Sequence, residues 1–280
     1  MLPPNRTRLK KTFGIKTWDG GLQGEKMLVY GKSGMGKTTL ASMAPRPVFI
    51  GLDDGGRKIR NPKTNEALRF VDGITTFDDV RDVLRSTSLF ENNKTIVIDT
   101  VTALEFLCTA HVIKTVPAKD NVPATNIESY GWGKGYRHLL DFMSLILQDC
   151  DALVKVGKNI LFLAQNQLAR QSNAEGDDYL ADMPSLYCGK WSVADRYIEW
   201  ADHVLIIRDV GLAVGKDKKV KGGQDRAVFT IKQPYYAAKS RPLVDGSHLP
   251  EAISFASAED DSLWTFLFGG KQDETKADDN

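Results

Sequence analysis

An eight-residue segment near the N-terminus has the composition of a phosphate-binding loop. It reads Gly31-Lys32-Ser33-Gly34-Met35-Gly36-Lys37-Thr38, which places two glycines, a lysine and a hydroxyl residue at the G-x-x-x-x-G-K-[ST] spacing. Glycines let consecutive backbone N–H groups converge on an anion, because no Cβ blocks the approach. We expect Lys37 to bridge the β- and γ-phosphates of a nucleoside triphosphate, Thr38 to ligate Mg²⁺ and Thr39 to reach the α-phosphate.

Acidic residues follow two of the apolar segments beyond this loop. Thr95-Ile96-Val97-Ile98-Asp99 is an apolar strand that ends in a carboxylate, which can hold Mg²⁺ through its water shell. Asp53 and Asp54 follow the apolar segment 48–52, and a carboxylate there could deprotonate the water that attacks a γ-phosphate. Asp-Asp-Gly-Gly also favours a turn, so both interpretations stay open. Asp53 is the preferred base because it lies nearer the strand.

The elements that must position these residues alternate between strands and helices, which is typical of a mainly parallel sheet with helices on both faces. Short segments rich in Val, Ile and Leu predict strands at 27–30, 47–52, 68–71, 95–98 and 159–164. Helical periodicity fills the gaps at 37–43, 77–89, 101–115 and 136–156. In such a sheet, ligands bind at the carboxyl ends of the strands, where both motifs lie.

The pattern changes late in the chain. Segments 203–210 and 227–233 predict an antiparallel strand pair that extends the sheet edge. The segment between them, 211–226, is rich in lysine and turn residues, and its cations, including Arg226, are expected at an exposed hairpin tip.

Composition excludes several other classes of protein. The chain has 280 residues, 42% hydrophobic and 26% charged, as expected for a globular protein of one large or two small domains. Its three cysteines and four histidines show no disulfide or zinc spacing. No apolar run reaches the ~18 residues of a membrane span, and the N-terminus lacks a signal-peptide pattern, so we expect a cytoplasmic protein without membrane attachment.

Charge is unevenly distributed, although the net charge is only +1. Residues 1–16 carry five cations and no acid, whereas residues 259–280 carry seven acids and two lysines. These patterns predict a basic N-terminal arm at 1–19, a core at 20–270 and a disordered acidic tail at 271–280.

The order of these features resembles the RecA-like ATPase core. Lys37, Asp53, Asp99 and the apolar segment ending in Gln165 follow one another as phosphate loop, acid-tipped strand, second acid-tipped strand and Gln-tipped strand. The likeness covers residues 20–245 and is greater to short phage-encoded nucleotide-binding proteins that act as core-only recombinases or single-strand annealing proteins. It implies an α/β RecA-like P-loop fold and an ATPase that uses ATP and Mg²⁺, with hydrolysis that is slow or stimulated by DNA.

The resemblance also implies partners and roles for residues outside the loop. The partners would be single-stranded DNA and other copies of the chain in a ring or filament, and could include a single-strand binding protein, within a host cell if the protein is phage-encoded. Gln165, or Gln167 two positions later, would sense the γ-phosphate. Lys239 and Arg241 would act on the nucleotide of a neighbouring subunit.

Two long segments, 116–135 and 169–191, fall where RecA-like proteins place DNA-binding loops, and neither shows a convincing pattern of regular structure. Aromatic and cationic residues are interleaved there, which suits single-stranded nucleic acid because bases stack on rings while cations meet phosphates. The candidate contacts are Trp132, Lys134, Arg137, Arg170 and Lys190. The alternative interpretation is that the loop aromatics are partly buried, and acidic residues dilute the second segment.

Two rival functions stay open. One is a P-loop kinase acting on a small molecule, although a kinase lid needs several arginines and 169–191 contains only Arg170. The other is a non-hydrolysing nucleic-acid annealing module, in which the nucleotide only orders the fold or the oligomer.

Overall fold

The computed structural model of the protein describes residues 15, 23–173, 175–210, 213–214, 220–221 and 225–269. The acidic tail predicted at 271–280 lies outside these residues, as does the basic arm predicted at 1–19 except for Ile15. Only the backbone is described for Asp54 and Lys119, and for 213–214 and 220–221.

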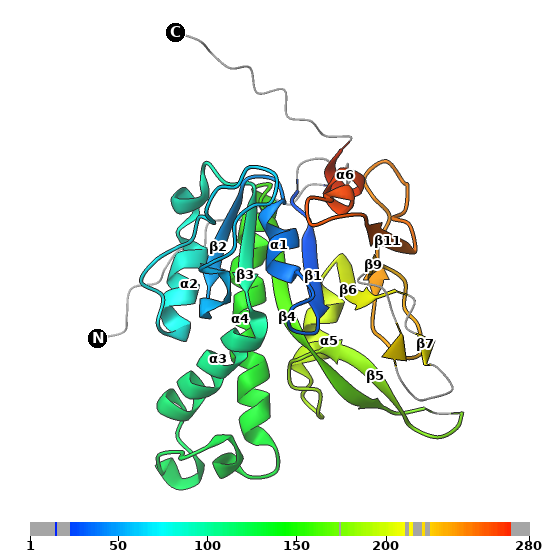
Figure 1. The fold of residues 1–280 in the computed structure, drawn as a ribbon. Helices are drawn as coiled ribbons and strands as arrows, with labels where there is room; N and C mark the ends of the chain where they lie inside the picture. The colour runs from blue at the N-terminus through cyan, green and yellow to red at the C-terminus, as the bar shows by residue number, and fades with distance from the viewer. Residues whose placement is uncertain are drawn as a thin grey trace.

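A mainly parallel sheet forms the centre of the molecule, with the strand order β11-β9-β6-β1-β4-β3-β2 (Figure 1). Its parallel strands are β1 (Lys26–Gly31), β2 (Pro47–Gly51), β3 (Thr95–Asp99), β4 (Asn159–Gln171) and β6 (His203–Asp209). All begin at or near the predicted positions, because each is an aliphatic run that the sheet buries on both faces. β4 lies between β1, which leads into the glycine-rich loop, and β3, which ends in Asp99.

Helices cover both faces of this sheet. One face packs against α2 (Phe77–Arg85), α3 (Val101–Thr115), α4 (Lys134–Lys155) and α5 (Val193–Trp200). The other face packs against α1 (Lys37–Ser42) and α6 (Ser262–Phe268). Successive residues of β1 enter opposite cores, as the two-residue period of a strand requires. None of the described helices is long and apolar enough to cross a membrane.

Antiparallel strands extend one edge of the sheet. β9 (Arg226–Phe229) pairs with β6 as predicted, and β11 (Ala252–Phe255), which the sequence did not indicate, pairs with β9. β10 (Lys239–Ser240) pairs with the start of β6. Between β6 and β9, β7 (Ala213–Val214) pairs with β8 (Val220–Lys221), and most of the predicted basic turn lies outside the described residues.

Two predicted elements are shorter than expected. The helix predicted at 77–89 ends at Arg85, because Ser86 (φ −82°, ψ 72°) leaves the helical region, and the 3-10 turn η2 (Thr87–Phe90) follows. The strand predicted at 68–71 reduces to a parallel bridge between Phe49 and Phe70 beside β2. The fold class is nevertheless as predicted: an α/β protein with a mainly parallel sheet, helices on both faces and an antiparallel edge.

Two projections extend beyond the carboxyl edge of the sheet (Figure 1). The first is the α3–α4 helical hairpin, whose tip contains the 3-10 turns η3 (Lys119–Asn121) and η4 (Ile127–Tyr130). The second is the continuation of β4, which pairs with β5 (Tyr179–Pro184) as a β-hairpin. The prediction that 169–191 lacks regular structure is therefore wrong, because its backbone groups are satisfied by the ladder between β4 and β5.

Candidate nucleotide-binding site

The glycine-rich loop connects the carboxyl end of β1 to the start of α1. Gly34 and Gly36 have φ values of +79° and +88°, in the left-handed region that favours glycine. A Cβ at Gly34 would meet nothing within 4 Å, so glycine is needed there for its backbone angles. At Gly31 a Cβ would lie 2.8 Å from the Ile207 carbonyl oxygen on β6, so glycine is needed there for space.

Lys37 is the buried cation of this loop, with only 7% of its surface exposed. Its Nζ donates to the carbonyl oxygens of Gly31 (2.8 Å) and Lys32 (2.9 Å) and to Gln165 Oε1 (3.1 Å). Burial lowers the pKa of Lys37, while the charges of Asp99 and Asp53 act in the opposite direction. All three hydrogen-bond acceptors are neutral, so this desolvated ammonium group favours an arriving anion such as phosphate.

Thr38 and Asp99 meet beside Lys37. Thr38 Oγ1 donates to Asp99 Oδ2 at 2.7 Å, and Asp99 is 6% exposed at the end of β3. Burial raises the pKa of Asp99, and the hydrogen bond from Thr38 opposes that shift. A hydroxyl and a carboxylate are oxygen donors of the kind that Mg²⁺ prefers, so these two side chains fit the predicted metal site.

Asp53 lies at the carboxyl end of β2, directly before the 3-10 turn η1 (Asp54–Gly56). Its Oδ1 accepts a hydrogen bond from the Gly55 backbone N–H at 3.0 Å, as the turn interpretation expects. The same residue lines a pocket of about 300 Å³ together with Asp99. The turn interpretation and the general-base interpretation of Asp53 are therefore compatible. Its exposed carboxylate accepts the hydrogen bond of the turn and also lines the pocket at Asp99.

The strand register separates the two candidate glutamines. Gln165 is the partner of Gly31 in the β1–β4 pairing, which places its Oε1 next to Lys37 Nζ. Gln167 lies further along β4, where its Nε2 donates to the carbonyl oxygens of Pro184 and Leu186 and to Cys188 Sγ. Gln165 therefore belongs to the site, and Gln167 fastens the β4–β5 hairpin.

A family model described as an AAA domain matches residues 23–241. The chain belongs to the AAA domain family. Its strand order and phosphate loop are those of a RecA-like P-loop NTPase. Membership of this ATPase family indicates nucleotide binding.

Two solved structures also match this AAA domain. The flagellar accessory protein FlaH from Methanocaldococcus jannaschii is 11% identical with a TM-score of 0.41, covering 83% of this chain and 85% of FlaH. The KaiC-like protein PH0186 from Pyrococcus horikoshii OT3 is 15% identical with a TM-score of 0.41, covering 81% of this chain and 91% of PH0186. No curated protein matches the chain.

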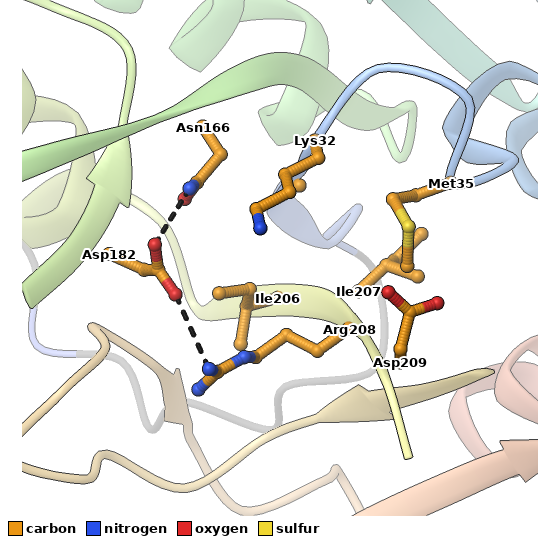
Figure 2. A pocket seen from close by; sticks show the side chains of 9 residues that line it. Lys32, Met35, Asn166, Asp182, Ile206, Ile207, Arg208 and Asp209 are labelled. Atoms are coloured by element: carbon orange, nitrogen blue, oxygen red, sulfur yellow. Dashed lines mark hydrogen bonds and ion pairs between the residues drawn. The ribbon is translucent and has the colours of Figure 1, made fainter. Parts of the chain in front are cut away.

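A small pocket of about 50 Å³ adjoins the loop of the AAA domain on the β6 side. Figure 2 shows Lys32 of the loop facing Asn166, Asp182 and Arg208 across it. Asn166 Nδ2 donates to Asp182 Oδ1 at 2.7 Å, and the Arg208 guanidinium lies 3.6 Å from Asp182 Oδ2. Asn166, the residue after Gln165, is thus linked through Asp182 to β5 and to Arg208 on β6. Sequence analysis missed this cluster because no local pattern relates three strands so far apart.

Lys239 and Arg241 lie at the other edge of the sheet. β10 pairs with His203 and Val204 at the amino end of β6, whereas Gly31 pairs with Ile207 near its carboxyl end. Lys239 Nζ donates to the Ile198 carbonyl oxygen at 2.6 Å, and the Arg241 guanidinium lies 3.2 Å from Asp202. The structure therefore does not bring these cations to the nucleotide site of their own chain.

The predicted nucleic-acid residues fall into three places. Trp132 and Lys134 are exposed at the tip of the α3–α4 hairpin, where Trp132 is 98% exposed. Arg137 on α4 and Lys190 both lie over the Trp191 ring, at 5.4 and 5.6 Å from its centroid. Arg170 is separate from these groups, because it pairs with Asp178 at 2.8 Å within the β4–β5 hairpin.

Proposed function

We propose that this AAA domain binds ATP with Mg²⁺ and hydrolyses it. The observation that carries the proposal is the buried Lys37, whose Nζ has only neutral acceptors and lies beside the hydrogen-bonded pair of Thr38 and Asp99. A buried ammonium group in a glycine-rich loop is costly unless an anion binds there. A triphosphate supplies that anion.

The side chains divide the chemistry between them. Thr38 and Asp99 would hold Mg²⁺, which when bound neutralises charge on the phosphate oxygens. Asp53 accepts the proton of the attacking water, whose oxygen bonds to the γ-phosphorus as the bond to the β–γ bridging oxygen breaks. Gln165 responds to the γ-phosphate through its contact with Lys37. ADP and phosphate are the products.

Lys37→Ala tests the site. Steady-state phosphate release and nucleotide affinity are measured with and without single-stranded DNA, and both should fall to background in this variant. Lys155→Ala is the matched control, since Lys155 is an exposed lysine at the far end of α4. Unchanged affinity and hydrolysis in Lys37→Ala would refute the proposal, and annealing without any hydrolysis by the wild type would favour the non-hydrolysing module.

We also propose that the protein binds single-stranded DNA and promotes recombination or annealing. Trp132 supports this, because a bulky residue with φ +52° between two glycines at positive φ is rare and is held almost fully exposed. The Tyr136 and Tyr187 rings stack at 3.9 Å, which holds the Arg137–Trp191–Lys190 cluster beside the helical hairpin. Rings and cations of this kind suit unpaired bases and phosphates.

Assembly into a ring or filament is the third part of the proposal, with a single-strand binding protein as a further partner. Lys239 and Arg241 lie away from their own loop, so a nucleotide that they contact would be one held by a neighbouring copy. Mixing two variants tests this. Lys37→Ala lacks a working loop but keeps both cations, whereas Arg241→Ala keeps the loop. A mixture of the two should recover ATPase activity where a Lys37→Ala copy lies next to an Arg241→Ala copy. Recovery should be absent if the cations act within one chain, and Arg241→Ala should be fully active by itself if they do not act at all.

A P-loop kinase acting on a small molecule is the second candidate, and one observation favours it. The pocket of about 300 Å³ beside Asp99 is lined by two aromatic rings, an arginine and an acid, from Phe49, Phe70, Arg57 and Asp53. Such a lining suits a ring-bearing alcohol as phosphate acceptor. Phosphate that appears on an added nucleoside, rather than in solution, would indicate the kinase.

A further inference from the structure

Strand β9 brings an arginine onto the phosphate loop. Arg226 is the first residue of β9, and it pairs with Asp209 of β6 on one side and with Phe255 of β11 on the other. Its Nη1 lies 3.0 Å from the position that a Cβ would take on Gly36. The expectation that Arg226 lies at an exposed hairpin tip is therefore wrong, because pairing with β6 places it half-buried at the carboxyl edge of the sheet.

Arg226 differs from most arginines in the described part of the chain in how its charge is balanced. Within the residues that the structure describes, no carboxylate lies within ion-pair distance of its guanidinium. Other arginines do have such a partner, among them Arg81, Arg170, Arg196, Arg208 and Arg241. A half-buried guanidinium without a carboxylate, placed against a loop of backbone N–H groups, favours an anionic ligand.

A pocket of about 100 Å³ lies beside this guanidinium. The loop contributes Met35 and Gly36 to its wall, and α1 contributes Thr39. The chain around and after β11 contributes Phe255 and Asp260. The pocket is distinct from the larger one at Asp53, which lies toward Asp99 and the expected γ-phosphate. A nucleotide whose γ-phosphate points to Asp99 would direct its base and ribose the other way, toward Phe255.

We infer that Arg226 and Phe255 form the outer wall of the nucleotide site, with Arg226 as a positioning residue for the phosphate chain and Phe255 as the surface on which the base stacks. Guanidinium groups bind phosphate oxygens through paired N–H donors, and aromatic rings stack on bases. The antiparallel edge of the sheet is thereby part of the nucleotide site. The inference rests on the proposed function.

Two probes separate the two roles. Inorganic tripolyphosphate with Mg²⁺ tests only the phosphate contacts, whereas ATP tests the phosphates and the base, and both affinities are measured by calorimetry. Arg226→Ala should weaken both ligands by roughly 10- to 100-fold, the loss expected for a charge-assisted hydrogen bond. Phe255→Leu, which keeps an apolar side chain in the partly buried position, should weaken ATP about 5-fold and leave tripolyphosphate unchanged.

The controls distinguish the possible failures. Lys232→Ala removes an exposed cation shortly after β9 and should bind both probes like the wild type. Thermal unfolding checks that each variant remains folded, and Arg226→Lys, which keeps the charge, should recover part of the affinity. If the wild type binds neither probe, the proposed function fails. If the wild type binds both and Arg226→Ala does too with unchanged affinity, the inference alone is overturned.

Discussion

The nucleotide site and the tip of the α3–α4 hairpin belong to the same edge of the sheet, but they hold their residues in opposite ways (Figure 1). Lys37 and Asp99 are 7% and 6% exposed and are fixed by hydrogen bonds to neighbours on β1, α1 and β4. Trp132 is 98% exposed and has a left-handed backbone. Chemistry on a phosphate requires groups that are already oriented, whereas capture of a flexible strand requires accessible rings and cations.

The two regions are joined by α3. Thr102, in its first turn, accepts a hydrogen bond from the Gln165 backbone N–H at 3.1 Å. Glu105, one turn later, accepts one from the Tyr187 backbone N–H at 2.8 Å, and the Tyr187 ring stacks on Tyr136 at the start of α4. Gln165 is therefore connected to the helical hairpin by a short series of hydrogen bonds, ring contacts and the backbone of α3.

The largest expected effect tests the rigid region. Asp99→Asn removes the carboxylate charge that would hold Mg²⁺ but keeps an acceptor for Thr38, so turnover should fall roughly 10²- to 10³-fold. Measured without nucleotide, the affinity for single-stranded DNA should not change, because the Asp99 side chain bonds to Thr38 and not to a residue of the tip. Asp72→Asn, at an exposed position before α2, is the matched control. Wild-type turnover in Asp99→Asn would remove Asp99 from the mechanism.

A smaller effect, on the pH dependence of stability, tests Glu105 on α3, the helix that joins the two regions. Burial raises the pKa of Glu105 to about 7, well above its ordinary value of 4.5. A raised pKa means that the folded state favours the protonated acid, so the stability present below pH 4.5 is lost as pH rises through 7. The expected loss is at most about 3 to 4 kcal/mol, because the pKa rises from 4.5 to about 7 and each pH unit corresponds to about 1.4 kcal/mol.

Denaturant unfolding at pH 5 and pH 8.5 measures this loss. Glu105→Gln keeps an oxygen that accepts from Tyr187 but cannot ionise, so its stability should change less between the two pH values than that of the wild type. Glu91→Gln alters an exposed acid and should follow the wild type. Equal pH dependence in Glu105→Gln and the wild type would show that Glu105 does not titrate in this range.

Local sequence was enough to predict the rigid region. The segment 95–99 is an aliphatic run followed by Thr100, whose side chain caps α3 by accepting from the Ala103 N–H at 3.1 Å, and the helix covers the predicted range 101–115. The loop motif likewise predicted that a helix begins near Lys37, and α1 starts at that residue. These features are formed by residues that are close together in the chain, so the local sequence is sufficient to predict them.

Features that depend on strand register could not be predicted. Gln165 and Gln167 lie on the same side of β4, so only the pairing of Gln165 with Gly31 separates them. β5 was missed because Tyr179 and Leu180 are exposed and give no buried alternation. Arg226 reaches Gly36 only through the pairing of β9 with β6, which brings together residues 190 positions apart.

A change at the tip should affect DNA and spare the nucleotide. Trp132→Ala should weaken binding of a single-stranded oligonucleotide by about 1 to 3 kcal/mol if a base stacks on the ring, without changing ATP affinity. Phe106→Ala is the control, since Phe106 is 72% exposed on α3 but lies away from the tip. Fluorescence anisotropy at matched salt compares the two, and identical affinities would exclude the tip from the DNA site.

The smallest expected effect concerns Arg170 on the β4–β5 hairpin. It tests whether this hairpin contacts DNA as the α3–α4 tip is proposed to do. Its ion pair with Asp178 is 77% exposed on the arginine side, so the pair contributes only about 0 to 1 kcal/mol to stability. If Arg170 also meets a phosphate, Arg170→Ala should lower the slope of log affinity against log salt by about 0.7. Asp178→Ala frees the guanidinium and should strengthen binding slightly. Unchanged salt slopes in both variants would restrict the DNA contacts to the helical hairpin and the Trp191 cluster.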